Sequence, residues 1–407
     1  MTKKVSTPAI RFKGFTDTWE QRKLGGIGET YTGLSGKTKD DFGHGQARFV
    51  SYMNVFSNPI SNPEMTEPIE IDLKQNEVEV GDVFFTTSSE TAKEVGMSSV
   101  LLEKRGKTYL NSFCFGFRPL KKIDSYYLAY MLRSESAREK IILLAQGISR
   151  YNISKNKVME IAVSLPSLDE QKLIGQYFRQ LDHLITLHQR KYDKLTNVKK
   201  SMLEKMFPKN GSNVPEIRFK GFTDAWEQRK LGEVSDSYSG GTPSVGVKEY
   251  YGGQIPFIRS AEINSEITEL SLTEGGLKNS SARLVDVGDI LYALYGATSG
   301  EVGRARLKGA INQAILAIKP HACYDSEYLA QWLRKSKHSI IETYLQGGQG
   351  NLSGTIVKEL SVDFPLLKEQ QAIGNFFSQL DHLITLHQRK LEKLKNLKKA
   401  CLEKMFV

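Results

Sequence analysis

Two stretches of the chain carry stripe residues at alternating steps of four and three positions. This spacing is the heptad pattern of a long helix that packs along one face against another helix. The stripe is mostly apolar, but the same two polar residue types, a histidine and a lysine, interrupt it in both stretches. The first stripe consists of Ile174, Phe178, Leu181, Ile185, His188, Tyr192, Leu195, Lys199, Met202 and Met206. The second consists of Ile373, Phe377, Leu380, Ile384, His387, Leu391, Leu394, Lys398, Cys401 and Met405.

A proline precedes each stripe, Pro166 in VSLPSLDEQ and Pro365 in VDFPLLKEQ. Proline ends an extended segment and leads into a first helical turn that favours acidic residues. We therefore expect each helix to begin a few residues after its proline. Because the two stripes match, each helix is the nearest available partner of the other. An antiparallel pair would be related by a pseudo-twofold axis and would bring the two chain ends together.

The sequences around the stripes occur twice. The segment PAIRFKGFTDTWEQRKLG at Pro8 returns at Pro215 as PEIRFKGFTDAWEQRKLG, an offset of 215 − 8 = 207. The stretch from Glu170 to Phe207 returns from Glu369 to Phe406, an offset of 369 − 170 = 199. An internal duplication of this kind determines the architecture, because each copy is one structural unit.

Between the repeated blocks the two halves share only a skeleton, such as Gly81-Asp82 with Gly288-Asp289. Short apolar runs follow these Gly-Asp turns, whereas Tyr126 to Arg133 and Glu327 to Arg334 have helical spacing, so both variable segments are expected to be mixed α/β domains. The predicted boundaries are a lead-in at 1–28, a first variable domain at 29–165, a helix at 166–207, a linker and second lead-in at 208–232, a second variable domain at 233–364 and a helix at 365–407.

The predicted fold class is therefore α+β. Two mixed α/β domains are separated by two long antiparallel helices that form a coiled-coil arm, and an internal pseudo-twofold repeat relates the halves. The segment PKNGSNV from Pro208 to Val214 has the proline, glycine and asparagine of a linker.

Composition adds a preference for a polyanionic partner. Lysine and arginine number 56 against 46 acidic residues, which gives a formal net charge of +10, and such an excess favours nucleic acid. The three cysteines are far apart and have no ligand or pairing spacing, as expected of free thiols in a reducing compartment. The first residues lack the apolar core of a signal peptide and no apolar run reaches membrane-spanning length, so we expect a cytoplasmic protein without a membrane partner.

Catalytic and metal motifs are not evident, and the predicted catalytic and metal sets are empty. YTGLSGKT at Tyr31 to Thr38 resembles a phosphate loop, but tyrosine stands where the first glycine is required. Asp40 and Asp41 are interpreted as a solvated loop without a basic or metal-binding partner nearby. His188 and His387 fall on the helical stripe, which favours a role in helix register over metal binding. No adenine-methyltransferase or dinucleotide motif is present.

This arrangement resembles the specificity subunits of type I restriction-modification systems. The resemblance covers nearly the whole chain and rests on Phe12 to Gly25, Phe219 to Gly232, Pro166 to Gln171, Pro365 to Gln370 and the two heptad helices. The resemblance implies a non-catalytic subunit of a multisubunit adenine-specific DNA methyltransferase and endonuclease complex. Each variable domain would then be a target-recognition domain that reads one half of a split, asymmetric double-stranded DNA target.

The resemblance also implies partners. Two modification methyltransferase subunits would dock on the helices, and restriction-translocation subunits would join the full complex. S-adenosylmethionine, ATP and Mg would be bound by those partners and not by this chain. An apolar stripe wider than the strict seam indicates a docking surface, and the residues that widen it are Leu184, Val198, Leu383 and Leu397.

Candidate DNA contacts were sought among polar residues in loops of the variable domains, because base readout needs bidentate donors and phosphate contacts need cations and hydroxyls. In the first domain they are Arg48, Tyr52, Asn54, Ser88, Ser89, Lys93, Arg150, Tyr151 and Asn152. In the second they are Arg259, Ser260, Asn264, Tyr295, Thr298, Arg304, Gln349 and Asn351.

Two other classes of function stay open at this point. A stand-alone methyltransferase or nuclease would need a cofactor or metal constellation that the sequence does not display. A coiled-coil adaptor without DNA specificity would leave unexplained why the repeated frame is preserved while the variable domains diverge.

Overall fold

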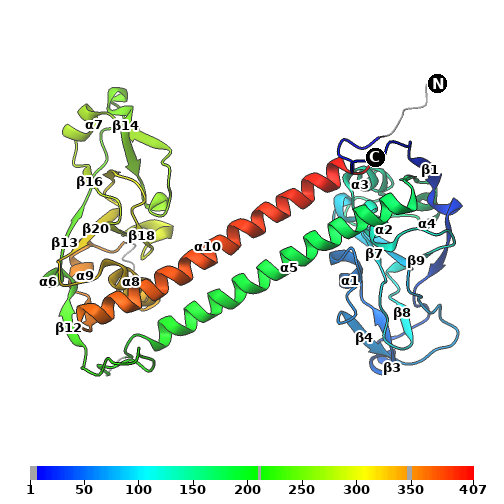
Figure 1. The fold of residues 1–407 in the computed structure, drawn as a ribbon, viewed down its shortest axis with the longest axis horizontal. Coiled ribbons are helices and arrows are strands. Elements are labelled where there is room, and N and C mark those ends of the chain that lie inside the picture. Colours follow the sequence, from blue (N-terminus) through cyan, green and yellow to red (C-terminus); the bar gives the residue numbers. More distant parts are fainter. Residues whose placement is uncertain (1–6, 210–211, 346–350) are drawn as a thin grey trace. The chain divides into compact units, whose positions relative to one another are not determined.

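The computed structural model describes residues 7–209, 212–345 and 351–407. The chain divides into two compact units: unit 1 is formed by Met1–Gln189 with Arg389–Val407, and unit 2 by Arg190–Gln388. Each unit therefore contains one variable domain and parts of both long helices (Figure 1). Of the predicted linker at Pro208 to Val214, positions 210 and 211 lie outside the described residues.

The two stripes form the long helices that their spacing predicts. Helix α5 spans Leu168–Lys205 and helix α10 spans Leu367–Lys404, with 38 residues each. Every stripe residue is buried or half-buried, whereas most of the intervening positions are exposed. The heptad seam predicted from the sequence is therefore confirmed.

Among its described residues, unit 1 contains two main sheets and four short α-helices. The larger sheet has the order β2 (Gly28–Thr32), β9 (Cys114–Pro119), β5 (Val83–Thr86), β7 (Ser98–Val100). The smaller has the order β4 (Thr66–Ile69), β3 (Phe42–Val50), β8 (Thr108–Leu110). Two-stranded pairs join β1 (Glu20–Lys23) to β11 (Ala162–Leu165) and β6 (Ser88–Ser89) to β10 (Tyr151–Asn152). The helices are α1 (Tyr52–Ser57), α2 (Ser125–Met131), α3 (Glu135–Ile142) and α4 (Lys155–Met159).

Unit 2 repeats this plan. Its first sheet has the order β13 (Ser235–Ser239), β20 (Ile315–Pro320), β17 (Ile290–Ala293), β18 (Val302–Arg304). Its second has the order β15 (Leu270–Leu272), β14 (Tyr251–Ile258), β19 (Gly309–Ile311), β16 (Arg283–Val285). Strand β12 (Glu227–Lys230) pairs with β21 (Ser361–Phe364), as β1 pairs with β11. The helices are α6 (Leu231–Val234), α7 (Glu274–Lys278), α8 (Ser326–Tyr344) and α9 (Gly354–Lys358).

The secondary structure agrees with the patterns named in the sequence. The apolar runs after the Gly-Asp turns form β5 and β17. Of the two segments with helical spacing, Glu327 to Arg334 lies in α8, and the first lies in α2 except for its last two residues. The fold is α+β, with mixed domains attached to long helices. None of the helices among the described residues is long and apolar enough to cross a membrane.

The helices pack antiparallel within each unit. In unit 1 the start of α5 meets the end of α10, where the Tyr177 hydroxyl lies 3.5 Å from Cys401 Sγ. In unit 2 the end of α5 meets the start of α10, and the Phe207 and Phe377 rings are 6.1 Å apart. The predicted antiparallel pairing is confirmed in both places.

The end of each long helix joins the lead-in of the other repeat. The backbone N–H of Ile10 donates to the Lys404 carbonyl at 3.0 Å, and that of Ile217 donates to the Lys205 carbonyl at 2.9 Å. In Figure 1 the red end of α10 accordingly lies against the blue and cyan domain of unit 1. The first described residues therefore lie beside the last helix, as predicted, while Met1 itself is outside the described residues.

The end of each helix also fills the core of a domain. In unit 1 the Phe406 ring lies 5.7 Å from Tyr127 and 5.6 Å from Phe178. In unit 2 the Phe207 ring lies 5.3 Å from Tyr328. Phe406 is 4% exposed and Phe207 1% exposed, so both rings belong to the hydrophobic cores. Each domain core therefore includes residues from the end of the other repeat's helix.

The lysine that interrupts each stripe forms an ion pair with the opposite helix. Lys398 Nζ lies 2.5 Å from Asp182 Oδ1 in unit 1, and Lys199 Nζ lies 2.5 Å from Asp381 Oδ1 in unit 2. A polar residue on an apolar seam stabilises only those registers that bring it to its partner. These two pairs therefore select the antiparallel register within each unit.

Replacement of Asp182 by alanine is expected to destabilise unit 1. The carboxylate also accepts a hydrogen bond from the Tyr130 hydroxyl at 2.7 Å, so its removal leaves two polar groups without this partner. We expect the free energy of unfolding to fall by about 1–3 kcal/mol, measured by urea unfolding. The control is Glu392→Ala on the exposed face of α10, which should change stability by no more than about 0.5 kcal/mol. Equal stabilities for the two variants would contradict a register role for the ion pair.

Candidate nucleic-acid interface

The repeated lead-in and helix starts form the frame on which each variable domain is built. In unit 1 the Arg11 guanidinium donates to both carboxylate oxygens of Glu170, at 2.7 and 2.9 Å. In unit 2 Arg218 holds Glu369 in the same way at 2.7 Å for both bonds. Each glutamate side chain is only 1% exposed, and the hydrogen bond raises the pKa of each arginine. Such bidentate pairs have a defined geometry as well as strength, so they fix the lead-in to the helix.

The glutamine that follows each glutamate links the long helix to its domain. Gln171 donates to the Pro166 carbonyl at 2.9 Å and accepts from the Asp124 backbone N–H at 3.0 Å. Gln370 makes the equivalent bonds to Pro365 and Asp325, at 2.8 and 2.9 Å. One turn later a Cβ at Gly175 would lie 2.6 Å from Asp124 Oδ1, so this close approach requires glycine. The repeated Pro…Glu-Gln motif thus has a structural function.

In the first variable domain, four of the predicted DNA contacts line one pocket of about 660 Å³. Tyr52, Ser88, Ser89 and Arg150 contribute to its walls. The remaining lining residues are Met53, Phe56, Glu90, Glu94 and Ser149, none of which is among the contacts predicted from the sequence. The pocket therefore combines donors, carboxylates and apolar groups, which are the chemical types that read base edges in the major groove.

A short hairpin positions Arg150 at this pocket. Gln146 and Asn152 exchange backbone hydrogen bonds at 2.9 and 2.7 Å, and Gly147 has a φ of +132° that only glycine adopts easily. Strand β10 then pairs antiparallel with β6, with Tyr151 opposite Ser89 and Asn152 opposite Ser88. Asn351 forms an equivalent bridge with Tyr295 in the second domain. Asn152 and Asn351 therefore occupy corresponding framework positions.

Several candidates in the first domain have their polar groups occupied by the protein itself. The Tyr52 hydroxyl donates to the Ser88 carbonyl at 2.6 Å, and burial raises the pKa of this phenol. Ser88 and Ser89 are only 5% and 6% exposed. The Arg48 guanidinium binds Thr66, with Nε 2.6 Å from the hydroxyl. The hydrogen bonds of Tyr52 and Arg48 and the burial of the two serines favour structural roles for these side chains.

Asn54 is the clearest departure from the expected site. It is fully buried, and its amide nitrogen donates to the carbonyls of Asn62 at 2.7 Å and Met65 at 3.0 Å. Its amide oxygen accepts from the Asn62 backbone N–H at 2.8 Å. A side chain with no exposed surface cannot hydrogen-bond to DNA, so the structure does not support Asn54 as a DNA contact. Lys93, Arg150 and Asn152 are exposed, and Tyr151 is half-buried beside them.

The second-domain candidates do not gather in one pocket. Asn264 and Arg304 line one of about 390 Å³, whereas Arg259 lines another of about 360 Å³. Arg259 is bound by Glu262 at 3.1 Å and by Glu269, and these carboxylates raise its pKa. Arg304 is bound by Glu327 at 2.8 Å and by the Gly288 carbonyl at 2.7 Å. Both arginines already have acidic partners in this structure.

The remaining second-domain candidates are half-buried, exposed or outside the described residues. Ser260 is half-buried in a short 3-10 helix (Ser260–Glu262). The Thr298 hydroxyl donates to the Tyr295 carbonyl at 3.2 Å, and both side chains are half-buried. Asn351 is exposed, while Gln349 lies outside the described residues.

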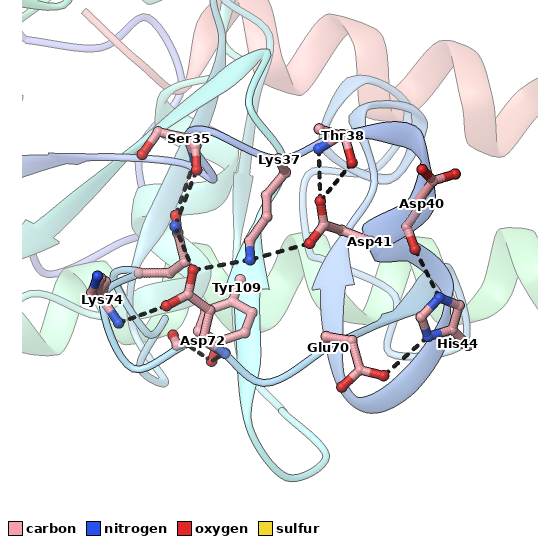
Figure 2. A network of polar contacts seen from close by, with 11 residues as sticks. Ser35, Lys37, Thr38, Asp40, Asp41, His44, Glu70, Asp72, Lys74 and Tyr109 are labelled. Atoms are coloured by element: carbon pink, nitrogen blue, oxygen red, sulfur yellow. Dashed lines mark hydrogen bonds and ion pairs between the residues drawn. The ribbon is translucent and has the colours of Figure 1, made fainter.

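The loop that resembled a phosphate loop is held by carboxylates (Figure 2). Lys37 Nζ lies 2.9 Å from Asp72 and 3.6 Å from Asp41, and the lysine keeps the pKa of Asp72 well below its usual range. The expectation that Asp40 and Asp41 have no basic company was therefore wrong for Asp41. Its partner comes from the preceding turn, while His44 binds the Asp40 carbonyl at 2.8 Å and Glu70 at 3.0 Å.

The predicted docking residues lie on the long helices. Leu184, Leu383 and Leu397 are 40%, 40% and 43% exposed, whereas Val198 is half-buried and packs against the unit 2 core. In unit 1, Leu184 lines a pocket of about 600 Å³ whose other walls are Gln176, Arg179, Gln180 and His183. Leu187 and Leu386, each 37% exposed, extend the apolar surface and were missed from the sequence.

The family model for the type I restriction modification DNA specificity domain matches residues 16–197 and again residues 223–396. The chain belongs to this family. A putative type I restriction enzyme specificity subunit of Methanocaldococcus jannaschii, MjaX, is 25% identical over 403 residues, which cover 94% of this chain and 91% of that protein. A second specificity subunit of that archaeon, MjaIX, is 30% identical over 190 residues, or 45% of this chain and 44% of the relative.

Solved structures of this family share the fold. The S subunit of a type I restriction-modification system from M. genitalium superposes with a TM-score of 0.62 at 15% identity, covering 99% of both chains. The two matches of the specificity-domain model each take in one variable domain and most of the helix that follows it. The interpretation as a type I specificity subunit, made from the repeated motifs, is therefore confirmed.

Asn54 and Arg150 are expected to respond differently to substitution. Asn54→Ala removes buried hydrogen bonds and should lower the free energy of unfolding by about 1–3 kcal/mol. Arg150→Gln alters an exposed side chain and should change stability by no more than about 0.5 kcal/mol, while weakening binding to target DNA. Urea unfolding and a DNA-binding titration separate the two effects. A stable Asn54→Ala protein that has lost DNA binding would restore Asn54 as a contact residue.

Proposed function

We propose that this chain is the non-catalytic subunit that selects the DNA target of a type I restriction-modification complex. The observation that carries the proposal is the contrast between frame and pockets. The two frames share the same contacts, down to the bidentate arginine-glutamate pair, whereas the surfaces of the two variable domains present different side chains. Two variable domains with different surface side chains, held on equivalent frames, would recognise the two different halves of a bipartite, asymmetric target in double-stranded DNA.

The catalytic groups would then belong to partner subunits. We infer that S-adenosylmethionine is bound by two modification methyltransferase subunits, and that ATP and Mg are used by restriction-translocation subunits where these are present. The net charge of +10 supports an electrostatic share in DNA binding. The contribution of this chain would be to hold two reading surfaces and to carry the methyltransferases to the site that they modify.

Exchange of Glu29 to Ser164 for the corresponding domain of a related subunit tests the division of labour. The junctions lie near the paired strands β1 and β11, which belong to the frame side of the domain. We expect methylome sequencing of a host that carries the hybrid to show one half of the methylated target altered and the other half unchanged. An adaptor without DNA specificity would leave the methylated sequence as it was, and a change in both halves would show that the domains are not independent readers.

The exposed leucines of the helices are the proposed docking surface for methyltransferase. Leu184→Glu and Leu383→Glu each place a carboxylate where an apolar contact is expected, and burial of an unpaired charge costs several kcal/mol or prevents contact. We expect at least about a tenfold loss of affinity for the methyltransferase, measured by co-purification and titration. The matched control is Leu73→Glu, at a site that is 82% exposed in the first variable domain. Unchanged assembly of both helix variants, with normal circular dichroism, would rule out this surface.

A further inference from the structure

The pairing of β6 with β10 continues into two opposed charges. Tyr151 lies opposite Ser89 in the antiparallel register. Arg150 precedes Tyr151 and Glu90 follows Ser89, so these two residues are the next opposed pair beyond the end of the ladder. Both line the pocket of about 660 Å³ in the first variable domain. The fold thus brings a guanidinium and a carboxylate, 60 positions apart in the sequence (150 − 90), to one edge of one pocket.

Neither charge is paired with another described residue of the chain. Both side chains are exposed, and no hydrogen bond or ion pair joins either of them to another residue in the part of the chain that the structure describes. Opposite charges that face each other across two strands ordinarily stabilise the pair. Glu94, the second carboxylate of the pocket, differs because it accepts a hydrogen bond from the Thr91 hydroxyl at 2.7 Å. The carboxylate of Glu90 and the guanidinium of Arg150 are therefore available for hydrogen bonds to a partner outside the chain.

The chemistry of this pair fits one kind of base pair. In the major groove guanine presents two acceptors, O6 and N7, which match the two donors of an arginine fork, and cytosine presents the N4 amino donor, which matches a carboxylate. A G·C pair would satisfy both side chains with three hydrogen bonds. An A·T pair would offer the carboxylate the adenine N6 amino group but would give the arginine no pair of acceptors on one base edge.

We propose that the first variable domain reads a G·C base pair, with Arg150 on guanine and Glu90 on cytosine. The inference rests on the proposed function and specifies the chemistry of its first reading surface. Glu90 is then a specificity-determining residue, and its position in the second domain is taken by Ala297, since Glu94-Val95-Gly96 corresponds to Glu301-Val302-Gly303 at an offset of 301 − 94 = 207. The second domain has no carboxylate at this position, so the two half-sites differ here.

The test combines base analogues with protein variants in the complex formed with the methyltransferase subunits. The target comes from the methylome, and the domain exchange assigns one half-site to the first domain. At each G·C pair of that half-site, cytosine is replaced by 2-pyrimidinone, which lacks the N4 amino group, or guanine by 7-deazaguanine, which lacks N7. We expect one G·C pair at which each analogue weakens binding by the wild-type complex about tenfold to a hundredfold.

The variants identify which side chain recognises each group. Glu90→Ala, which copies Ala297, should bind the natural and the 2-pyrimidinone duplex equally while remaining sensitive to 7-deazaguanine. Arg150→Gln should show the reverse pattern. The matched control is Glu29→Ala, which removes an exposed carboxylate on β2 that lies outside the pocket, and it should respond to both analogues as the wild type does.

Two results would overturn the proposal while leaving the proposed function intact. One is a first half-site without a G·C pair in a chain that still directs methylation to a bipartite target. The other is a Glu90→Ala complex that remains as sensitive as the wild type to loss of the cytosine amino group. Failure of the wild-type complex to bind any target duplex above random DNA would instead count against the proposed function itself.

Discussion

The insertion of each helix end into the core of a domain is the interaction on which the rest of the structure depends. Phe406 reaches Tyr127 and Phe178 in unit 1, and Phe207 reaches Tyr328 and Phe377 in unit 2. Removal of a buried phenylalanine typically costs about 3–5 kcal/mol, so neither core is complete without this ring. The contact also fixes the direction of the helices, because the end of one helix must lie beside the start of the other.

Polar contacts then fix the geometry in which these apolar helix ends pack into the domain cores. The buried glutamates at the helix starts accept two hydrogen bonds from one arginine, and the lysines of the seam reach one aspartate on the opposite helix. Loss of one partner from the buried arginine–glutamate pairs leaves an uncompensated charge, which costs about 3–5 kcal/mol. The repeated sequence is therefore explained largely by contacts within the frame. The side chains between the repeats are free to differ, because few of these frame contacts involve them.

The architecture could be predicted from the sequence because it is encoded in local and periodic signals. The heptad spacing determined the long helices, the Gly-Asp turns located β5 and β17, and the duplication predicted the pairing of equal helices. The lysines of the seam were recognised as interruptions, but their aspartate partners were not, since Asp182 and Asp381 lie off the stripe. Partners of this kind depend on the register between helices, which the sequence of one helix does not reveal.

The DNA-contacting residues were harder to predict, because residue type does not show which polar side chains form hydrogen bonds within the protein. Asn54 and Arg48 have the chemistry of base readers but are bound by neighbouring backbone or side chains. Arg259 and Arg304 are bound by glutamates. Glu90 was overlooked because a carboxylate in a basic, DNA-binding chain does not suggest a DNA contact. Its significance comes from its position opposite Arg150, which only the pairing of β6 with β10 creates.

Because each domain core includes a distant helix end, the order of synthesis also determines when each core can be completed. Unit 2 receives Phe207 from a segment that is synthesised before its own domain, so its core can close as that domain emerges. Unit 1 needs Phe406, which lies 279 positions after Tyr127. At about 5–20 residues per second, the roughly 200 residues after Phe207 take about 10–40 s to synthesise. Throughout that interval the core of the first domain lacks the ring that packs against Tyr127 and Phe178.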